Sequence, residues 1–407
     1  MPGRARGDPG APLPPAPDPW AGSEMPERRT APPFHMTEMI EAEPALAVRI
    51  LERLASPSGP AAALAAAIRA ASTRGLPIVV TGCGTSEHGA LGTVEILRAA
   101  LRTAGLPWQL GRGGTPVAAQ AFEAWLEDGL GGEGGVVIGV SHEGGTWATN
   151  GALERAKASG AMVALITVSA RSPGAHLADV TLTTEEQDQS WCHTVGYVSP
   201  LLAAAAVAAH ITREPLDPGV VQDLMAAGLA PAAVAATEAM ADALANVDRL
   251  IVIGSGVDRP AARELVLKVE EGAHLPAAMR DLETLLHGHL AGMDTRTGVV
   301  LILADPSRAD ERAARAAGVL RAVRELGGPA GAILGPPSDS AIGAELAPAG
   351  RLLVPAAPGV PPVVAAVLGT AVPLQLLTER LARARGVDPD PIRRDDPTYL
   401  QAADAAG

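Results

Sequence analysis

The feature that most constrains the fold is a unit of apolar strand, Gly-bearing turn and helix that recurs along the chain. In its first copy, the strand Ile78 to Thr81 enters the turn TGCGTSEHG, and a helix follows to about Leu101. The pattern returns in residues 134–160 and 161–184. Strands that are apolar throughout are typical of parallel sheets, whose two faces are both buried under helices. The sequence therefore predicts a parallel sheet flanked by helices.

The same layout appears a second time in the C-terminal half. The stretch DRLIVIGSGVDRPAARELVLKVEEGAHL again reads as strand, turn and helix, and the strands GVVLILAD, GPAGAILG and GRLLVPAA follow. This repeat predicts an α/β fold of two domains, residues 36–211 and 247–386, each a flavodoxin-like layered sandwich. A helical connector, 212–246, and a polar tail, 387–407, complete the chain. Residues 1–35, rich in Pro, Gly and Arg, are expected to be disordered.

Composition narrows the class of protein. A length of 407 residues with 47% hydrophobic residues suffices for two buried cores, and the formal charge of −13 argues against nonspecific nucleic-acid binding but leaves room for an isolated basic pocket. Two cysteines form neither a disulfide framework nor a zinc cluster. No secretory signal is evident, so a cytoplasmic location is predicted. The apolar stretch Pro355 to Leu377 is interrupted by Pro358, Pro361, Pro362 and Pro373 and is interpreted as buried core rather than a membrane span.

Two Gly-bearing turns could hold an anion at the carboxyl ends of the strands, where ligands of parallel sheets bind. In the first turn, Gly84 leaves the backbone accessible, and Thr85 and Ser86 supply hydroxyls at a helix start. Ser86 could equally serve only as a helix cap. The second turn, VSHEGGTWATNGAL, offers Ser141, Gly144, Thr146 and other small or hydroxyl-bearing residues. Neither turn matches a Walker loop or a dinucleotide fingerprint.

The third turn leads into a helix that places Glu264, Lys268 and Glu271 on one face. A carboxylate beside an amine can shuttle a proton, as aldose–ketose interconversion requires, although such a trio could also be a solvated surface salt bridge. Further on, His287 and His289 could transfer protons or be hydrogen-bonded structural histidines, and their spacing is a poor zinc signature. No metal and no cofactor is expected.

Together these segments resemble the SIS (sugar isomerase) domain family, and in particular the isomerase half of glutamine:fructose-6-phosphate aminotransferase. The resemblance runs from about Thr37 to Pro391. It rests on TEMIEAEPALAVRIL, TGCGTS, VSHEGGT, ELVLKVEEGAH, LLHGHLAGMD and VPLQLLTERLARARGVDPDPIR.

The resemblance implies a role for several residues. Glu271 would be the isomerisation base, while Glu264, Lys268 and His287 would assist proton handling and ring opening. The sugar phosphate would be held by the two turns, through Gly84, Thr85, Ser86, Ser141, His142, Gly144 and Thr146. In the family two chains pack together and a histidine reaches the neighbouring site, so a homodimer is implied.

The sequence also departs from the family pattern. His142 and Glu143 stand where the family has Gln and Ser, Gly145 replaces a Glu, and Pro397 aligns with the tail lysine. The first domain follows the N-terminal extension directly, so we expect no glutaminase domain. The leading hypothesis is a phosphosugar isomerase/deaminase acting on an amino-sugar or ketose phosphate. The alternatives are a noncatalytic sugar-phosphate sensor and an ammonia-dependent synthase subunit served by a separate glutaminase.

Overall fold

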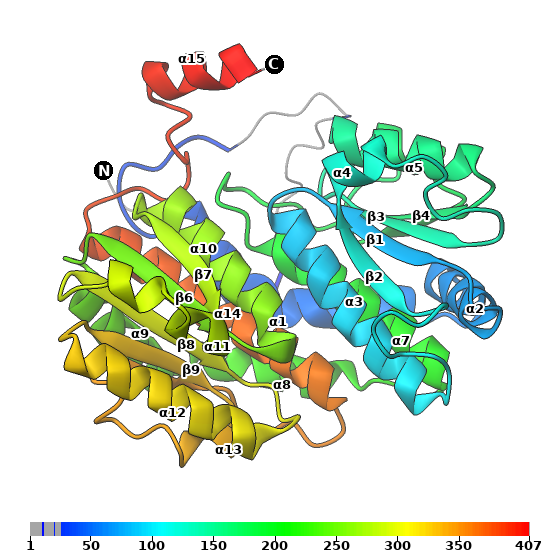
Figure 1. Cartoon of the computed structure of the whole chain (residues 1–407). Helices are drawn as coiled ribbons and strands as arrows, with labels where there is room; N and C mark the ends of the chain where they lie inside the picture. Colours follow the sequence, from blue (N-terminus) through cyan, green and yellow to red (C-terminus); the bar gives the residue numbers. More distant parts are fainter. Residues whose placement is uncertain (1–9, 12–19, 21–25, 407) are drawn as a thin grey trace.

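The structure is a computed structural model that describes residues 10, 11, 20 and 26–406, so most of the predicted disordered extension, 1–35, lies outside the described residues. It contains two five-stranded sheets, ordered β2-β1-β3-β4-β5 and β10-β9-β8-β6-β7. All neighbouring strands pair in parallel. Each sheet has the flavodoxin-like order, which confirms the predicted α/β class with two helix-flanked sheets (Figure 1).

The strands are β1 Ile78–Gly82, β2 Pro116–Gln120, β3 Val136–Val140, β4 Met162–Thr167, β5 Val180–Thr183, β6 Arg249–Gly254, β7 Ala277–Asp281, β8 Thr297–Leu303, β9 Ala330–Leu334 and β10 Gly350–Leu353. The helices of the first half are α1 His35–Leu54, α2 Pro60–Thr73, α3 Thr85–Thr103, α4 Ala121–Leu126, α5 Trp147–Ala158, α6 Pro173–Leu177 and α7 Val195–Thr212. Those of the second half are α8 Pro218–Ala226, α9 Pro231–Leu244, α10 Arg259–Ala273, α11 Leu282–Leu286, α12 Ala309–Glu325, α13 Pro336–Asp339, α14 Pro362–Ala384 and α15 Pro397–Ala406. Three short 3-10 turns lie at Ala227–Leu229, Gly256–Asp258 and His289–Gly292.

A layer of helices fills the space between the two sheets. Helices α3 and α7 cover the inner face of the first sheet, α10 and α14 cover that of the second, and α3 packs on α10 (Figure 1). The inner faces of both sheets belong to one continuous hydrophobic core, whereas the outer faces have separate cores. The contact of α3 with α10 brings a turn of the first sheet next to a helix of the second, which is what creates the candidate site.

Two strands, β2 and β7, were not predicted from the sequence. β2 is an edge strand with one buried residue in five, and all five residues of β7, also at an edge, are half-buried. Edge strands have one covered flank only, so they lack the continuous apolar run that marks central strands.

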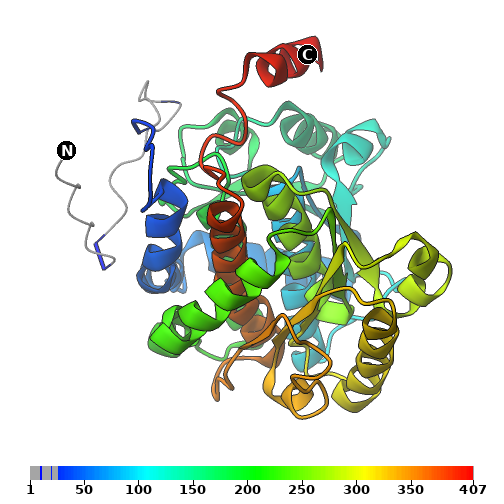
Figure 2. The same cartoon turned by 90° about the vertical axis from the view of Figure 1, so that its left-hand side faces the viewer.

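Helices α7 and α14 are, among the described residues, long and apolar enough to cross a membrane, but 83% and 89% of the relevant stretches are buried inside the fold. This burial agrees with the interpretation of residues 355–377 as core. The prolines do not interrupt the helix as expected, because α14 continues through Pro373. Its neighbours α1, α9 and α10 surround it, as Figure 2 shows for α1 and α10.

The C-terminal tail returns to the start of the folded chain. The carboxylate of Asp390 accepts hydrogen bonds from the backbone amides of His35 and Met36, at 2.8 and 2.9 Å. These are the first two residues of α1, so Asp390 supplies the cap that the helix otherwise lacks. The same segment contacts the loop after β5 through a hydrogen bond from the Trp191 amide to the Asp390 carbonyl. The tail is thereby fixed across the carboxyl end of the first sheet.

Candidate functional site

The first Gly-bearing turn presents a helix start at the end of β1. Gly84 has φ 57°, a left-handed conformation that glycine adopts without strain, and α3 begins at the next residue, Thr85. The Thr85 side chain is buried and Ser86 is half-buried. No side chain caps this helix within the described residues, so the predicted alternative role of Ser86 as a cap is not seen. Uncapped amides at a helix N-terminus favour an anion.

The second turn lies beside the first because β3 pairs with β1. Ser141 is buried; its Oγ accepts a hydrogen bond from the Gly144 amide at 3.2 Å and lies 3.3 Å from Thr146 Oγ1. Gly144 has φ 72°, and a side chain there would collide with Ser172. Thr146 is exposed and immediately precedes α5. Two helix starts with nearby hydroxyls therefore face the same strand ends, which is the arrangement expected for a phosphate site.

His142 lies on this turn but is turned into the protein. Its Nε2 accepts a hydrogen bond from the Asp188 amide at 3.0 Å, and its ring packs 5.2 Å from that of His193. Burial alone raises the pKa of Asp188, but His193, His142 and backbone amides outweigh this effect and lower it. The Asp188 carboxylate also accepts hydrogen bonds from the backbone amides at the start of α7. These contacts give His142 a structural hydrogen-bonding role. A contact of His142 with substrate stays a prediction.

The three charged residues of α10 form a buried network. Lys268 Nζ lies 2.5 Å from Glu271 Oε2 and 3.7 Å from Glu264 Oε1. The side chains of Glu264 and Lys268 are fully buried, whereas that of Glu271 is 23% exposed. The alternative of a solvated surface salt bridge is therefore wrong for these residues. Glu271 is the most exposed of these three residues.

Burial and the neighbouring charges shift the pKa values of Lys268 and Glu271. Burial lowers the pKa of Lys268, but the neighbouring carboxylates Glu271 and Glu264 outweigh it and hold the pKa above its usual value. Burial is the largest influence on Glu271 and raises its pKa, although Lys268 opposes the change. A carboxylate with a raised pKa is a stronger base. The ammonium beside it stabilises the ionised carboxylate, which is the form that accepts a proton.

Sequence reasoning missed a fourth member of the network, His88. Its Nδ1 lies 2.7 Å from Glu264 Oε2, so the first turn of α3 is linked to the charged face of α10. The four residues make a continuous chain from His88 through Glu264 and Lys268 to Glu271. The only sequence signal was a histidine three residues after Thr85, and its partner lies 176 positions away. That pairing exists only because α3 packs on α10.

The loop after β5 contributes two more residues that the sequence did not reveal. Cys192 is buried, with its Sγ 4.0 Å from the Lys268 carbonyl oxygen. His193 has a pKa lowered to about 3, chiefly by burial and further by the positive charges of Lys268 and Arg394, despite the opposing charge of Asp188. Its imidazole is consequently neutral at physiological pH, so its unprotonated ring nitrogen can accept a hydrogen bond.

His287 lies apart from this network within one chain. Its side chain is 71% exposed, and its Nε2 lies 2.8 Å from a carboxylate oxygen of Glu283. The third turn is likewise unsuited to a phosphate at its glycine, because the Arg312 and Asp305 side chains fill the space above Gly256. In residues 10, 11, 20 and 26–406 no group of three or more His, Cys, Asp or Glu could hold a metal ion.

Comparison with known proteins agrees with this architecture. Residues 243–341 match the model of the SIS domain family. A relative is the glutamine–fructose-6-phosphate aminotransferase (isomerizing) of Symbiobacterium thermophilum, 27% identical over 292 residues, 68% of this chain and 46% of the relative. The chain spans less than half the length of the curated relatives it matches.

Solved structures extend the likeness to both sheets. The C-terminal domain of glucosamine-fructose-6-phosphate aminotransferase from Francisella tularensis superimposes with a TM-score of 0.73 at 17% identity, covering 89% of this chain and 99% of that domain. The tagatose-6-phosphate ketose/aldose isomerase from Escherichia coli gives a TM-score of 0.68 at 18% identity, covering 91% and 98%. As the motifs predicted, the chain carries an SIS domain and resembles the isomerase half of glutamine:fructose-6-phosphate aminotransferase.

Proposed function

We propose that this protein is a phosphosugar isomerase/deaminase that acts on an amino-sugar or ketose phosphate. The observation that carries the proposal is the network that runs from His88 on α3 to Glu264, Lys268 and Glu271 on α10, the helix that packs against α3. Chemistry that only binds a sugar phosphate has no need of buried charges, whose desolvation is costly. Such a network is useful where a proton must be moved.

In the proposed reaction the phosphate binds at the starts of α3 and α5, with Thr85, Ser86, Ser141 and Thr146 as hydroxyl donors. The Glu271 carboxylate removes a proton from the carbon next to the carbonyl of the open-chain sugar, giving an enediol or enaminol. It returns the proton to the former carbonyl carbon, so isomerisation leaves the composition unchanged. With an amino sugar the product is an imine at C2, and one water molecule converts it to the ketone and ammonia.

One residue of the tail bears on the competing synthase function. The cation that the tail brings to the site is Arg394, whose guanidinium lies 3.9 Å from the centre of the Trp191 ring and contributes to the low pKa of His193. A guanidinium does not form an imine with a sugar carbonyl, unlike a lysine amine. We therefore favour isomerisation or deamination over amine transfer to the sugar.

The proposal includes a homodimer in the cytoplasm. His287 contacts none of the four network residues, so it would serve a site only when supplied by a second copy of the chain. A subunit titration by sedimentation, combined with activity of mixed Glu271→Gln and His287→Ala chains, tests this point. Recovery of activity in the mixture requires a shared site, and its absence contradicts the shared site.

The function is tested by incubating the purified protein with glucosamine 6-phosphate, fructose 6-phosphate and fructosamine 6-phosphate. Ammonia release and exchange of the C1 and C2 protons in deuterated buffer are followed by NMR. Glu271→Gln should slow both about 10²- to 10⁴-fold, the usual contribution of a general base. Glu270→Gln is the matched control, because Glu270 is the adjacent, exposed residue of the same helix.

The alternatives give different results in the same assays. Binding without turnover that is unaffected by Glu271→Gln identifies a sensor. Glucosamine 6-phosphate made from fructose 6-phosphate and ammonium, or a glutaminase that copurifies, identifies a synthase subunit. If none of the substrates shows ammonia release or proton exchange, the proposal of an isomerase/deaminase is refuted.

A further inference from the structure

An arginine-lined cavity lies between α3 and the carboxyl ends of β6 and β8, away from the site described above. Its volume is about 380 Å³. Its charged lining consists of Arg98, Arg102, Arg259, Arg312, Glu95 and Asp305. Four cations against two carboxylates give a local excess of positive charge, although the whole chain carries a formal charge of −13. A basic pocket in an acidic protein concentrates anions at that point.

The acidic residues in and around the cavity leave some of the arginine N–H donors without a hydrogen bond. Arg98 pairs with Glu95 at 3.2 Å, Arg259 pairs with Asp281 outside the lining, and Arg312 pairs with Asp305. Within the described part of the chain, the Arg102 guanidinium donates no hydrogen bond and lies 5.3 Å from the centre of the Trp108 ring. Arg102 therefore has its full set of donors available to a ligand.

Helix dipoles add to the positive potential. The cavity is lined by residues from the first turns of α10, α12 and α14, namely Arg259, Arg312 and Val363. Each helix N-terminus carries a partial positive charge, and here three of them converge on one cavity. These partial charges add to the positive potential that the arginines produce in the cavity.

The glycine turn of the second sheet directs where the anion can bind. Gly256, with φ 60°, corresponds to Gly84 of the first sheet, but its space is filled by a carboxylate of the protein itself. Asp305 accepts the amides of Val257 and Ser307, at 3.1 and 2.8 Å. An anionic ligand is thus excluded from the glycine and directed to the α3 side, where Arg98 and Arg102 lie.

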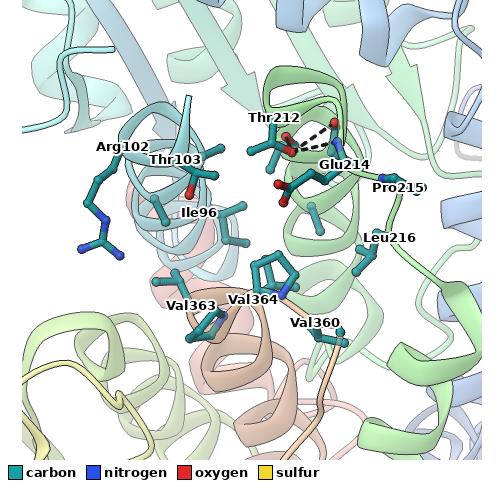
Figure 3. A pocket seen from close by; sticks show the side chains of 18 residues that line it. Ile96, Arg102, Thr103, Thr212, Glu214, Pro215, Leu216, Val360, Val363 and Val364 are labelled. Atoms are coloured by element: carbon teal, nitrogen blue, oxygen red, sulfur yellow. Dashed lines mark hydrogen bonds between the residues drawn. The ribbon is translucent and has the colours of Figure 1, made fainter. Parts of the chain in front are cut away.

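A second cleft, lined mainly by apolar residues, adjoins the cavity. This cleft, of about 300 Å³, shares Ala99, Arg102 and Val363 with the arginine-lined cavity. Figure 3 shows Ile96 and Val364 on its walls, Glu214 at the far side and Arg102 at the near rim. Glu214 would repel a second anionic group at that end. The joint shape therefore suits a ligand with one anionic end and one apolar part.

We propose that the two adjoining clefts form a second binding site for a small phosphate ester, with the phosphate at Arg102 and Arg98 and an apolar organic part between α3, α7 and α14. The site is separate from the candidate sugar-phosphate site. Helix α3 contributes to both, with Ser86 at one end and Ala99 thirteen residues later, a distance of about 20 Å at 1.5 Å per residue. The inference does not depend on the reaction proposed above.

The test uses phenyl phosphate as the probe, with inorganic phosphate and phenol as partial probes, and isothermal titration of the full chain. Phenyl phosphate should bind more tightly than either partial probe. Arg102→Glu should weaken it about ten- to hundredfold, the worth of a charge-assisted hydrogen bond. Arg321→Glu is the matched control: it makes the same charge change on the exposed face of α12, outside the cavity lining.

A second variant separates this site from the first. Ser86→Ala combined with Ser141→Ala should leave the part of phenyl phosphate binding that depends on Arg102 unchanged. Unchanged thermal unfolding of Arg102→Glu, expected because Arg102 is exposed, shows that the fold is intact. The proposal is overturned by no binding of phenyl phosphate up to about 10 mM, by equal effects of the two glutamate variants, or by loss of the Arg102-dependent binding in the serine variant.

Discussion

Replacing Lys268 by Met removes the ammonium that lies between Glu264 and Glu271 while keeping a similar volume. The side chains of Lys268 and Glu264 are both fully buried, and Glu271 is 23% exposed. The variant leaves two carboxylates in a low-dielectric interior without their shared partner. Removing one partner of a buried ion pair typically costs about 3–5 kcal/mol, because the other charge remains desolvated.

That cost converts into a measurable shift of the unfolding temperature. The entropy of unfolding is about 2.1 cal/mol/K per residue, or roughly 0.85 kcal/mol/K for the 407-residue chain. The expected decrease is therefore about 4–6 °C. Glu271 already has a pKa raised by burial, and without Lys268 that effect loses its main opposing influence. A raised folded-state pKa makes stability fall as pH rises through it, so the deficit should be larger at pH 8 than at pH 5.

Scanning calorimetry of the wild type, Lys268→Met and the triple variant Glu264→Gln/Lys268→Met/Glu271→Gln measures this. The triple variant should recover most of the loss, since no buried charge is left unpaired. Val266→Met, a half-buried position on the same helix, controls for side-chain size. A Lys268→Met protein that unfolds within about 1 °C of the wild type at both pH values refutes the claim that these residues form a buried charged network.

Three further perturbations follow from other parts of the structure. Glu43→Gln should raise the unfolding temperature by about 1–3 °C at pH 8 and less at pH 5. The reason is that burial holds the pKa of Glu43 well above its usual range, so the ionised carboxylate destabilises the fold. A decrease of the unfolding temperature at pH 8 contradicts this. Asp390→Ala removes the carboxylate that caps α1 and should cost about 1 kcal/mol and speed proteolysis of the tail, whereas unchanged cleavage would show that the tail is held by other contacts. His193 should remain neutral between pH 5 and 8 in an NMR titration, since its pKa is lowered to about 3, and a midpoint near 6.5 would show that its ring is solvated.

Much of the fold follows from local patterns in the sequence. Central strands such as β1 and β3 are apolar along their whole length because both faces are buried, and the glycines after them mark the turns. The repeat of this unit predicted two parallel sheets. The edge strands β2 and β7 escaped prediction because half-burial leaves no such pattern.

The sequence by itself also placed Glu264, Lys268 and Glu271 on one helix face, since their spacing depends on helix geometry alone. It could not decide whether that face was solvated or buried. Only the packing of α10 in the fold buries that face, the contact with α3 adds His88, and the path of the loop after β5 brings His193 close to Lys268. Burial and partners far apart in sequence depend on how whole elements pack, whereas turns and helix faces are set by neighbouring residues. That difference separates what the sequence determined from what the tertiary structure decided.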